Sequence, residues 1–221
     1  MITVVANLKG GSGKSTVVFN LALWLQSCAQ PVVTYDLDPQ CTLADVGAVR
    51  REEGYTPPLQ VYQQDTALPD QLAYHPGEVL VDVGAANMAG MRDALSVADR
   101  VIIPVPPSQP DVWATQRFLG IVEEALAGKD RRPQIQAFVN RADTHRAVRE
   151  SDETEEALGM LEGIDVLPQR LCQRTLYRRS LSEGLAVFEL SPRSKAAEEF
   201  HDFANALYPD YRPGRRKRNP A

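Results

Sequence analysis

The sequence predicts an α/β fold in which helices cover both faces of a mostly parallel, twisted sheet. Short β-branched runs alternate with longer helical patterns, and this alternation is typical of strand–helix–strand units. The first run is apolar on both faces, as a strand buried between two helical layers is. The chain has 221 residues, of which 43% are hydrophobic, enough for one domain with a sizeable core.

The first run, 2–7, predicts a buried strand, and 14–27 predicts a buried helix because its large apolar residues lie nearly all round the helix. Later β-branched runs predict further strands, and helical patterns fill the gaps between them. The expected strands are 31–38, a weaker 59–63, 78–84, 100–106, 134–141 and 164–169. The expected helices are 88–98, 111–127, 146–161, 174–183 and 192–207, the last with Ser191 as cap and Pro192 in its first turn.

We expect one domain over residues 1–209 and a basic, disordered tail over 210–221. Residues 208–221 contain three prolines and one glycine, with no apolar periodicity after Tyr211. The net charge is −5, yet the five basic residues from Arg212 onward have no acidic neighbour. Such asymmetry suggests that the tail meets an anionic polymer or surface.

Composition argues against several classes of protein. The three cysteines, Cys28, Cys41 and Cys172, lack the paired spacing of a disulfide framework or metal knuckle, which favours a reducing cytosol. No apolar run approaches the roughly 20 residues that span a bilayer. Residues 1–7 run straight into the loop described next, so we expect no removable signal peptide and a cytoplasmic protein.

The stretch "KGGSGKST", residues 9–16, follows the first expected strand and opens the first helix. Its glycines let backbone N–H groups converge on phosphate oxygens, and the helix dipole adds positive potential there. In such a loop Lys14 reaches the β- and γ-phosphates and Ser15 ligates Mg²⁺. The sequence therefore predicts a P-loop NTPase type of fold that binds nucleotide phosphates and Mg²⁺. The expected nucleotide-binding residues of the loop are Gly10, Gly11, Ser12, Gly13, Lys14, Ser15 and Thr16.

Carboxylates end two further expected strands. Asp36 and Asp38 lie two residues apart, so they share a face at the edge where open parallel sheets bind ligands. Asp82 closes the strand 78–84 and fits an acid on the Mg²⁺ side of the site, acting through a water. An Asp-Pro turn at Asp38 and a simple turn residue at Asp82 are the alternative interpretations.

These motifs resemble the ParA/MinD family of deviant P-loop ATPases, and among them the small, ParF-like partition ATPases. The resemblance rests on the early lysine of "KGGSGK", on "DLDPQ" at 36–40 and on "FVNR" at 138–141, and it spans about residues 1–205. Small residues follow Asp82 where many relatives have two prolines. Cys41 stands where the family usually has glycine.

The resemblance implies roles for individual residues. Lys9 would cross a dimer interface to the phosphates held by the partner, so that ATP binding and dimerisation become one event; on spacing alone, a solvated lysine is an equal alternative. Lys9, Lys14 and Asp38 would form the catalytic set, with Asp38 orienting or activating the attacking water. Ser15, Asp36 and Asp82 would serve the metal. Asn140 would hydrogen-bond adenine, and Pro168 would pack against it.

The segment 171–189 resembles the C-terminal family motif. The matching residues are Arg174, Tyr177, Gly184, Val187 and Glu189. Arg174 and Arg178 share one helical face with Arg179 alongside, and such a face would bind DNA phosphates without reading sequence. A second candidate set lies in the tail: Arg215, Arg216, Lys217 and Arg218. A solvated surface helix is the alternative for the first set, and a solubilising or nuclear-targeting-like tail for the second.

By resemblance we expect an ATPase that forms an ATP-dependent homodimer and binds nonspecific double-stranded DNA on the nucleoid. It would position a plasmid, a chromosome region or a protein body such as a carboxysome, with hydrolysis to ADP and phosphate stimulated by an adaptor on the cargo.

Three further classes of protein share the phosphate loop. A MinD-like membrane ATPase needs an amphipathic C-terminal helix, and no Leu, Ile, Phe, Val or Trp follows Tyr211. A metabolic ATP-dependent enzyme needs a pocket for a second substrate, which we do not identify in the sequence. An electron-transfer relative needs paired cysteines, and the sequence has no CxxC pair. The positioning ATPase is therefore the reading that the sequence favours.

Overall fold

The computed structural model describes residues 1–63, 66, 68–145 and 148–214. A sheet of eight strands lies at its centre, in the order β3-β2-β4-β1-β5-β6-β7, with β8 beside β6. All pairings within these residues are parallel. The strands are β1 (Ile2–Asn7), β2 (Val32–Asp36), β3 (Val61–Tyr62), β4 (Glu78–Gly84), β5 (Arg100–Val105), β6 (Gln134–Ala142), β7 (Asp165–Val166) and β8 (Leu171–Cys172).

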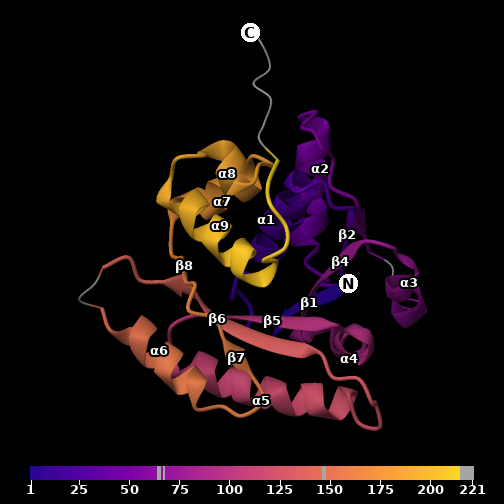
Figure 1. Cartoon of the computed structure of the whole chain (residues 1–221), viewed down its shortest axis with the longest axis vertical. Coiled ribbons are helices and arrows are strands. Elements are labelled where there is room, and N and C mark those ends of the chain that lie inside the picture. The colour runs from indigo at the N-terminus through magenta and orange to yellow at the C-terminus, as the bar shows by residue number, and fades with distance from the viewer. Residues whose placement is uncertain (64–65, 67, 146–147, 215–221) are drawn as a thin grey trace.

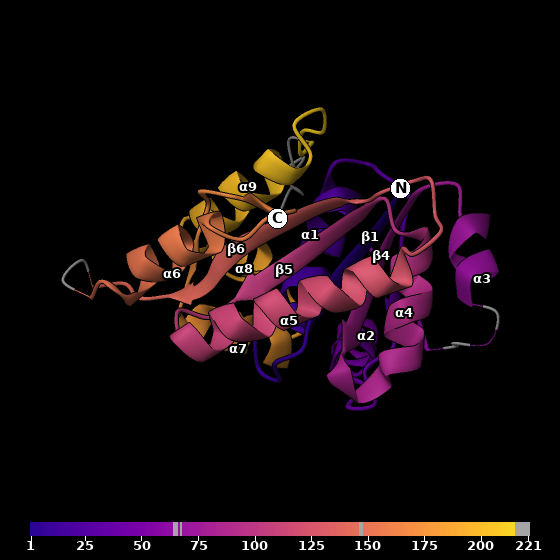
Figure 2. The same cartoon turned by 90° about the horizontal axis from the view of Figure 1, so that it is seen from below.

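Helices cover both faces of the sheet, which confirms the expected fold class (Figure 1). Figure 2 shows α4 and α5 crossing one face. This layer comprises α3 (Leu68–Tyr74), α4 (Met88–Val97, after the short 3₁₀ turn Ala85–Asn87), α5 (Gln109–Ala125) and α6 (Glu150–Gly159). The opposite layer comprises α1 (Lys14–Ser27), α2 (Thr42–Glu52), α7 (Thr175–Ser182), α8 (Val187–Leu190) and α9 (Lys195–Leu207).

Helix α1 is the centre of its layer, because it is enclosed by the sheet, α2 and α9. Its Phe19 and Trp24 are fully buried. In the same core, the ring centroids of Phe138 on β6 and Phe203 on α9 lie 4.4 Å apart. The apolar residues that lie nearly all round α1 are therefore buried against the sheet, α2 and α9, as the sequence predicted. This burial fixes the end of α1 that carries the glycine-rich loop.

Most expected elements form close to their predicted bounds, and α1 and β4 match them fully. Helices α2, α3 and α8 and strand β8 were not expected. The sequence of α2 alternates apolar, glycine and charged residues, and Gly47 packs so closely that an added Cβ would lie 3.0 Å from Val61. Tertiary contacts, more than periodicity, therefore hold this helix in place.

The expected cap of α9 was wrong. The helix begins at Lys195, and the hydroxyl of Ser194 accepts the backbone N–H of Ala197 at 3.2 Å. The same hydroxyl donates to the carbonyl of Ser191 at 2.8 Å. Ser191 therefore forms part of the preceding turn, and Ser194 is the serine whose side chain reaches the first free N–H groups.

The chain stays packed beyond the domain boundary expected at residue 209. Tyr211 stacks on Tyr208 with ring centroids 5.6 Å apart, and its hydroxyl donates to Glu78 at 2.8 Å. The backbone N–H of Gly214 donates to the carbonyl of Ser27 at 2.9 Å. Residues 210–214 thus lie against the domain. The expected basic tail residues 215–218 fall outside the described residues.

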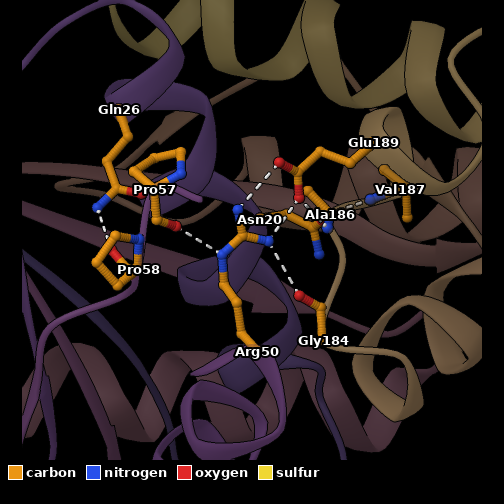
Figure 3. Close-up of polar contacts among 9 residues, drawn as sticks. All are labelled: Asn20, Gln26, Arg50, Pro57, Pro58, Gly184, Ala186, Val187 and Glu189. Carbon is orange, nitrogen blue, oxygen red and sulfur yellow. Dashed lines mark hydrogen bonds and ion pairs between the residues drawn. The ribbon is translucent and has the colours of Figure 1, made fainter. Parts of the chain in front are cut away.

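A buried ion pair joins α2 to α8 (Figure 3). Arg50 is fully buried, and its guanidinium donates to both carboxylate oxygens of Glu189, at 2.8 and 3.1 Å. It also donates to the carbonyl of Pro57 at 2.8 Å and to that of Gly184 at 3.0 Å. One side chain therefore ties together three segments that are distant in sequence.

Removing the carboxylate would leave the Arg50 guanidinium buried without its counter-charge. We expect Glu189→Ala to lower the free energy of unfolding by about 3–5 kcal/mol, measured by urea denaturation. The exposed pair Arg92–Glu124, at 51% and 67% side-chain exposure, is the control; Glu124→Ala should cost less than about 1 kcal/mol. The double variant Arg50→Met/Glu189→Leu should recover most of the loss. Equal losses for Glu189→Ala and Glu124→Ala would contradict this account.

Candidate nucleotide site

The glycine-rich loop joins β1 to α1 at the sheet edge formed by the carboxyl ends of the strands. A hollow opens there, which we call the phosphate-loop hollow. It is lined by Leu8, Gly10, Gly11, Gly13, Lys14, Ser15, Thr16, Asp38, Gln40, Thr42, Gly84, Ala85, Ala86, Arg141 and Leu181. The structure thus brings most of the predicted loop residues together with Asp38 and with the small residues after β4.

Lys14 and Asp38 approach each other over Gly84. Lys14 is only 7% exposed. A Cβ added to Gly84 would lie 2.8 Å from Oδ2 of Asp38 and 3.3 Å from Nζ of Lys14. Glycine is required here because the two charged groups take the space that a side chain would fill. The Lys14 ammonium and the Asp38 carboxylate therefore lie close together in the hollow.

Asp82, at the end of β4, is a fully buried acid, and neither of its carboxylate oxygens has a hydrogen-bond partner in the described chain. Burial raises its pKa from 3.8 to about 7, and the negative charge of Asp36 adds to the rise. The nearby Ser15 hydroxyl and the Lys14 ammonium act in the opposite direction. Such an orphaned carboxylate is suited to the water shell of a cation.

Asp36 supports the backbone around Asp38. One of its oxygens accepts the N–H of Asp38 at 3.2 Å, and the other accepts the N–H of Ala44 in α2 at 2.9 Å. Burial raises its pKa, and the hydrogen bond from Ala44 opposes this rise. Asp36 does not line the hollow. It holds the turn between β2 and α2, which presents Asp38 to the site.

Cys41 adopts the left-handed conformation, with φ of 53°, at the start of α2. Glycine favours this conformation, so the backbone keeps the shape that a glycine would give although a cysteine occupies the position. The departure from the family pattern at Cys41 therefore leaves Asp38 at the hollow.

Lys9 is half-buried, but it does not line the phosphate-loop hollow of its own chain. Its backbone N–H donates to Oδ1 of Asn7 at 3.0 Å, and its carbonyl lies 3.5 Å from Nζ of Lys14. The backbone of Lys9 therefore belongs to the loop.

A second hollow, the Asn140 hollow, adjoins the first. Buried Val17, Leu171 and Phe200 give it apolar walls. Asn140 is 7% exposed, and its Nδ2 donates to the carbonyl of Ser12 at 2.6 Å. Apolar walls beside a polar amide suit a nucleotide base, since the amide can both donate and accept.

Pro168 is not brought together with Asn140. It is exposed and lines a different depression, beside Arg170 and α9. The segment 171–175, which includes β8, lines the Asn140 hollow instead.

The three arginines around α7 differ in their surroundings. Arg174 donates to both oxygens of Glu199, so its charge is already paired. Arg179 forms an exposed pair with Glu183 at 2.9 Å. Arg178 is exposed, lines the Asn140 hollow and forms no ion pair within the described ranges. The structure therefore leaves Arg178 as the cation of this set that is open to a partner.

The comparisons with known proteins agree with this geometry. A family model described as the CobQ/CobB/MinD/ParA nucleotide binding domain matches residues 3–187. This chain belongs to that family. It is 31% identical over 214 residues to "Maintenance of carboxysome distribution protein A" of Halothiobacillus neapolitanus, covering 93% of this chain and 95% of that protein. It is 27% identical over 218 residues to "Protein ParA" of Rhizobium radiobacter, covering 94% and 96%.

Solved structures of the CobQ/CobB/MinD/ParA family share the fold. Apo McdA of Cyanothece superposes with a TM-score of 0.74 at 19% identity, covering 93% of this chain and 98% of that one. The septum site-determining protein MinD of Pyrococcus horikoshii, complexed with Mg-ADP, gives a TM-score of 0.71 at 17% identity, covering 93% and 95%. At these identities the likeness shows the fold.

The residues present fit the ATP and Mg²⁺ of this nucleotide-binding family. Among the described residues, no group of three His, Cys, Asp or Glu side chains forms a metal site. Phosphate oxygens and the Ser15 hydroxyl would be the main ligands, with Asp82 outside them, because Mg²⁺ usually keeps several waters and takes few protein ligands. When bound, the ion would neutralise phosphate charge.

Sequence reasoning missed several residues that shape the site. In the sequence, Arg50 looks like an ordinary arginine of a surface helix, and Asn20 looks like a polar residue in an otherwise apolar helix. Oδ1 of Asn20 accepts the N–H of Val187 at 2.8 Å (Figure 3), and its Nδ2 donates to the carbonyl of Thr16 at 2.9 Å. A lone polar residue within the apolar run of α1 was the one available signal.

We expect Gly84→Ala to lower ATP turnover by about 10- to 100-fold, because the new Cβ would displace Lys14 or Asp38 by a substantial fraction of an ångström. Gly120 on α5 is the matched control, since a Cβ there has no neighbour within 4 Å. Gly120→Ala should keep turnover unchanged and add about 0.5–1 kcal/mol of stability. Unchanged turnover in Gly84→Ala would contradict the close approach.

The raised pKa of Asp82 predicts a pH dependence in the protein free of nucleotide and Mg²⁺. The folded state keeps the proton up to about pH 7, whereas the unfolded state releases it near 3.8. The contribution of Asp82 to the free energy of unfolding should therefore fall as pH rises between these values. Urea denaturation of wild type and Asp82→Asn across this range would measure it. Parallel profiles for the two proteins would show that Asp82 is already ionised.

Proposed function

We propose that this chain is an ATP-dependent switch that positions a cargo. Two copies would dimerise on ATP, the dimer would bind nonspecific double-stranded DNA, and an adaptor on the cargo would stimulate hydrolysis to ADP and phosphate. The observation that carries this proposal is the phosphate-loop hollow, where Lys14 and Asp38 meet, together with a second lysine, Lys9, that does not line it.

Lys9 supports the dimer. Lys14 already supplies a buried cation to the site, and the half-buried Lys9 has no charged partner in the described part of the chain. A lysine held through its backbone beside the loop would reach phosphates bound by a second copy. Asp38 would then orient the attacking water, because its carboxylate faces the point where Lys14 lies.

DNA binding is supported at α7. Arg178 and Arg179 are exposed on this helix, and phosphate contacts from such a face carry no sequence information. The turn after α7 is also tied to both nucleotide-side helices: Arg50 of α2 donates to Gly184 at 3.0 Å, and Asn20 of α1 accepts from Val187 at 2.8 Å. We propose that a change at the phosphates would reach α7 through these two contacts, one to the turn after α7 and one to the first residue of α8.

The relatives guide the choice of cargo. The names of the two similar curated proteins refer to carboxysome distribution and to ParA. A protein body or a DNA element is accordingly the cargo that we propose, on the nucleoid in the cytoplasm. Within residues 1–214 as described, no helix is both long and apolar enough to cross a membrane.

Retention of nonspecific duplex DNA, measured with and without ATP, tests the switch. We expect retention only with ATP, and we expect Lys9→Ala to lose both this retention and the ATP-dependent dimer while still binding ADP. Arg178→Ala/Arg179→Ala should weaken retention and reduce its salt dependence, because phosphate contacts are lost. A chain ending at Gly214 tests the basic tail separately.

Lys129→Ala, in the exposed segment after α5, is the control for loss of a lysine and should match wild type. ATP-dependent dimers without DNA retention would overturn the DNA step alone. Nucleotide binding without ATP-dependent dimers would overturn the switch and favour a metabolic ATP-dependent enzyme.

A further inference from the structure

The two hollows meet at three residues. Gly13, Thr16 and Arg141 line both the phosphate-loop hollow and the Asn140 hollow. A nucleotide with its base in one hollow and its terminal phosphates in the other must pass its ribose and α-phosphate across these residues. Gly13 and Thr16 carry no charge. Among the described lining residues, Arg141 is therefore the cation at the crossing.

The backbone at Arg141 is unusual in two ways. Its φ is 58°, in the left-handed region, which is unfavourable for a residue with a Cβ. The pairing of β6 with β8 also shifts here, since Asn140 pairs with Leu171 and Ala142 with Cys172, which leaves Arg141 as the extra residue. Such irregularities re-aim a side chain and gather beside functional sites.

Both neighbours of Arg141 are fixed, so the irregularity is built into the strand. Asn140 is 7% exposed and bonded to the carbonyl of Ser12, and Ala142 is 2% exposed. The Arg141 side chain itself is exposed, and within the described residues it forms neither a hydrogen bond nor an ion pair. Nearby Arg174, in contrast, is paired with Glu199. The guanidinium of Arg141 is thus available to an anion.

We propose that Arg141 binds the α-phosphate of the nucleotide and so sets the affinity of the site for ADP and ATP alike. Lys14, deeper in the loop, acts on the β- and γ-phosphates. Because the α-phosphate is common to substrate and product, Arg141 retains ADP after hydrolysis as strongly as it holds ATP. The strained backbone at Arg141 is kept because it aims the guanidinium at the crossing. This inference rests on nucleotide binding by the site and is independent of the proposed DNA binding.

Calorimetric titration of wild type and variants with Mg-ADP and with a non-hydrolysable Mg-ATP analogue tests the inference. We expect Arg141→Ala to weaken both ligands by the same factor, about 10-fold, since one charge-assisted contact is lost from each. Arg141→Lys keeps the charge but not the forked geometry, so it should recover part of the affinity. The ratio of the two affinities should stay as in wild type.

Arg141→Gly separates loss of contact from loss of fold. Glycine accepts a φ of 58° without strain. The melting temperature of this variant should equal or exceed that of wild type, while its ADP affinity falls as in Arg141→Ala.

Unchanged ADP affinity in Arg141→Ala would overturn the inference. Weakening confined to the ATP analogue would also overturn it, because Arg141 would then act on the γ-phosphate or on the partner copy. If wild type bound neither ligand, nucleotide binding itself would fail, an outcome distinct from a selective effect of Arg141.

Discussion

The arrangement of the layer formed by α1, α2, α7, α8 and α9 depends on the hydrogen bonds of the buried Arg50 guanidinium. Its contacts reach Glu189, Gly184 and the carbonyl of Pro57, so α2, the segment before β3 and the turn between α7 and α8 are held at one point. Taking both charges out of water is expensive. The four hydrogen bonds of the guanidinium satisfy the buried charge only when all these segments are in place.

The same helix, α2, connects this pair to the chemistry. Asp36 accepts the N–H of Ala44 near the beginning of α2, and Arg50 lies near its end. Asn20 makes a parallel connection from α1. Packed helices move as units because interiors are dense. The Asp38 turn and the glycine-rich loop are therefore both connected to the same short stretch, residues 184–189, one through α2 and the other through α1.

Much of the fold and the loop could be predicted from sequence, because those signals are local. The buried run of β1, the apolar surface of α1 and the glycine spacing each lie within a few neighbouring residues. The Arg50–Glu189 pair joins residues 139 positions apart and leaves no local pattern. Helix α2 has weak periodicity, and the extra residue at Arg141 depends on how β8 pairs. Pro168 was placed by family resemblance, whereas the surroundings of the site depend on how this chain runs from β7 to β8.

The path of the last described residues separates Arg212 from the arginines of α7. Gly214 is bonded to Ser27, at the end of α1 that lies farthest from the glycine-rich loop. The 14 residues of α1 span about 21 Å. Helix α7 begins beside the Asn140 hollow, at the other end of that length. Arg212, which is exposed and acts electrostatically on Cys28, therefore lies at one end of α1, and the α7 arginines lie toward the other end. A straight polyanion would have to extend along the whole of α1 to touch both.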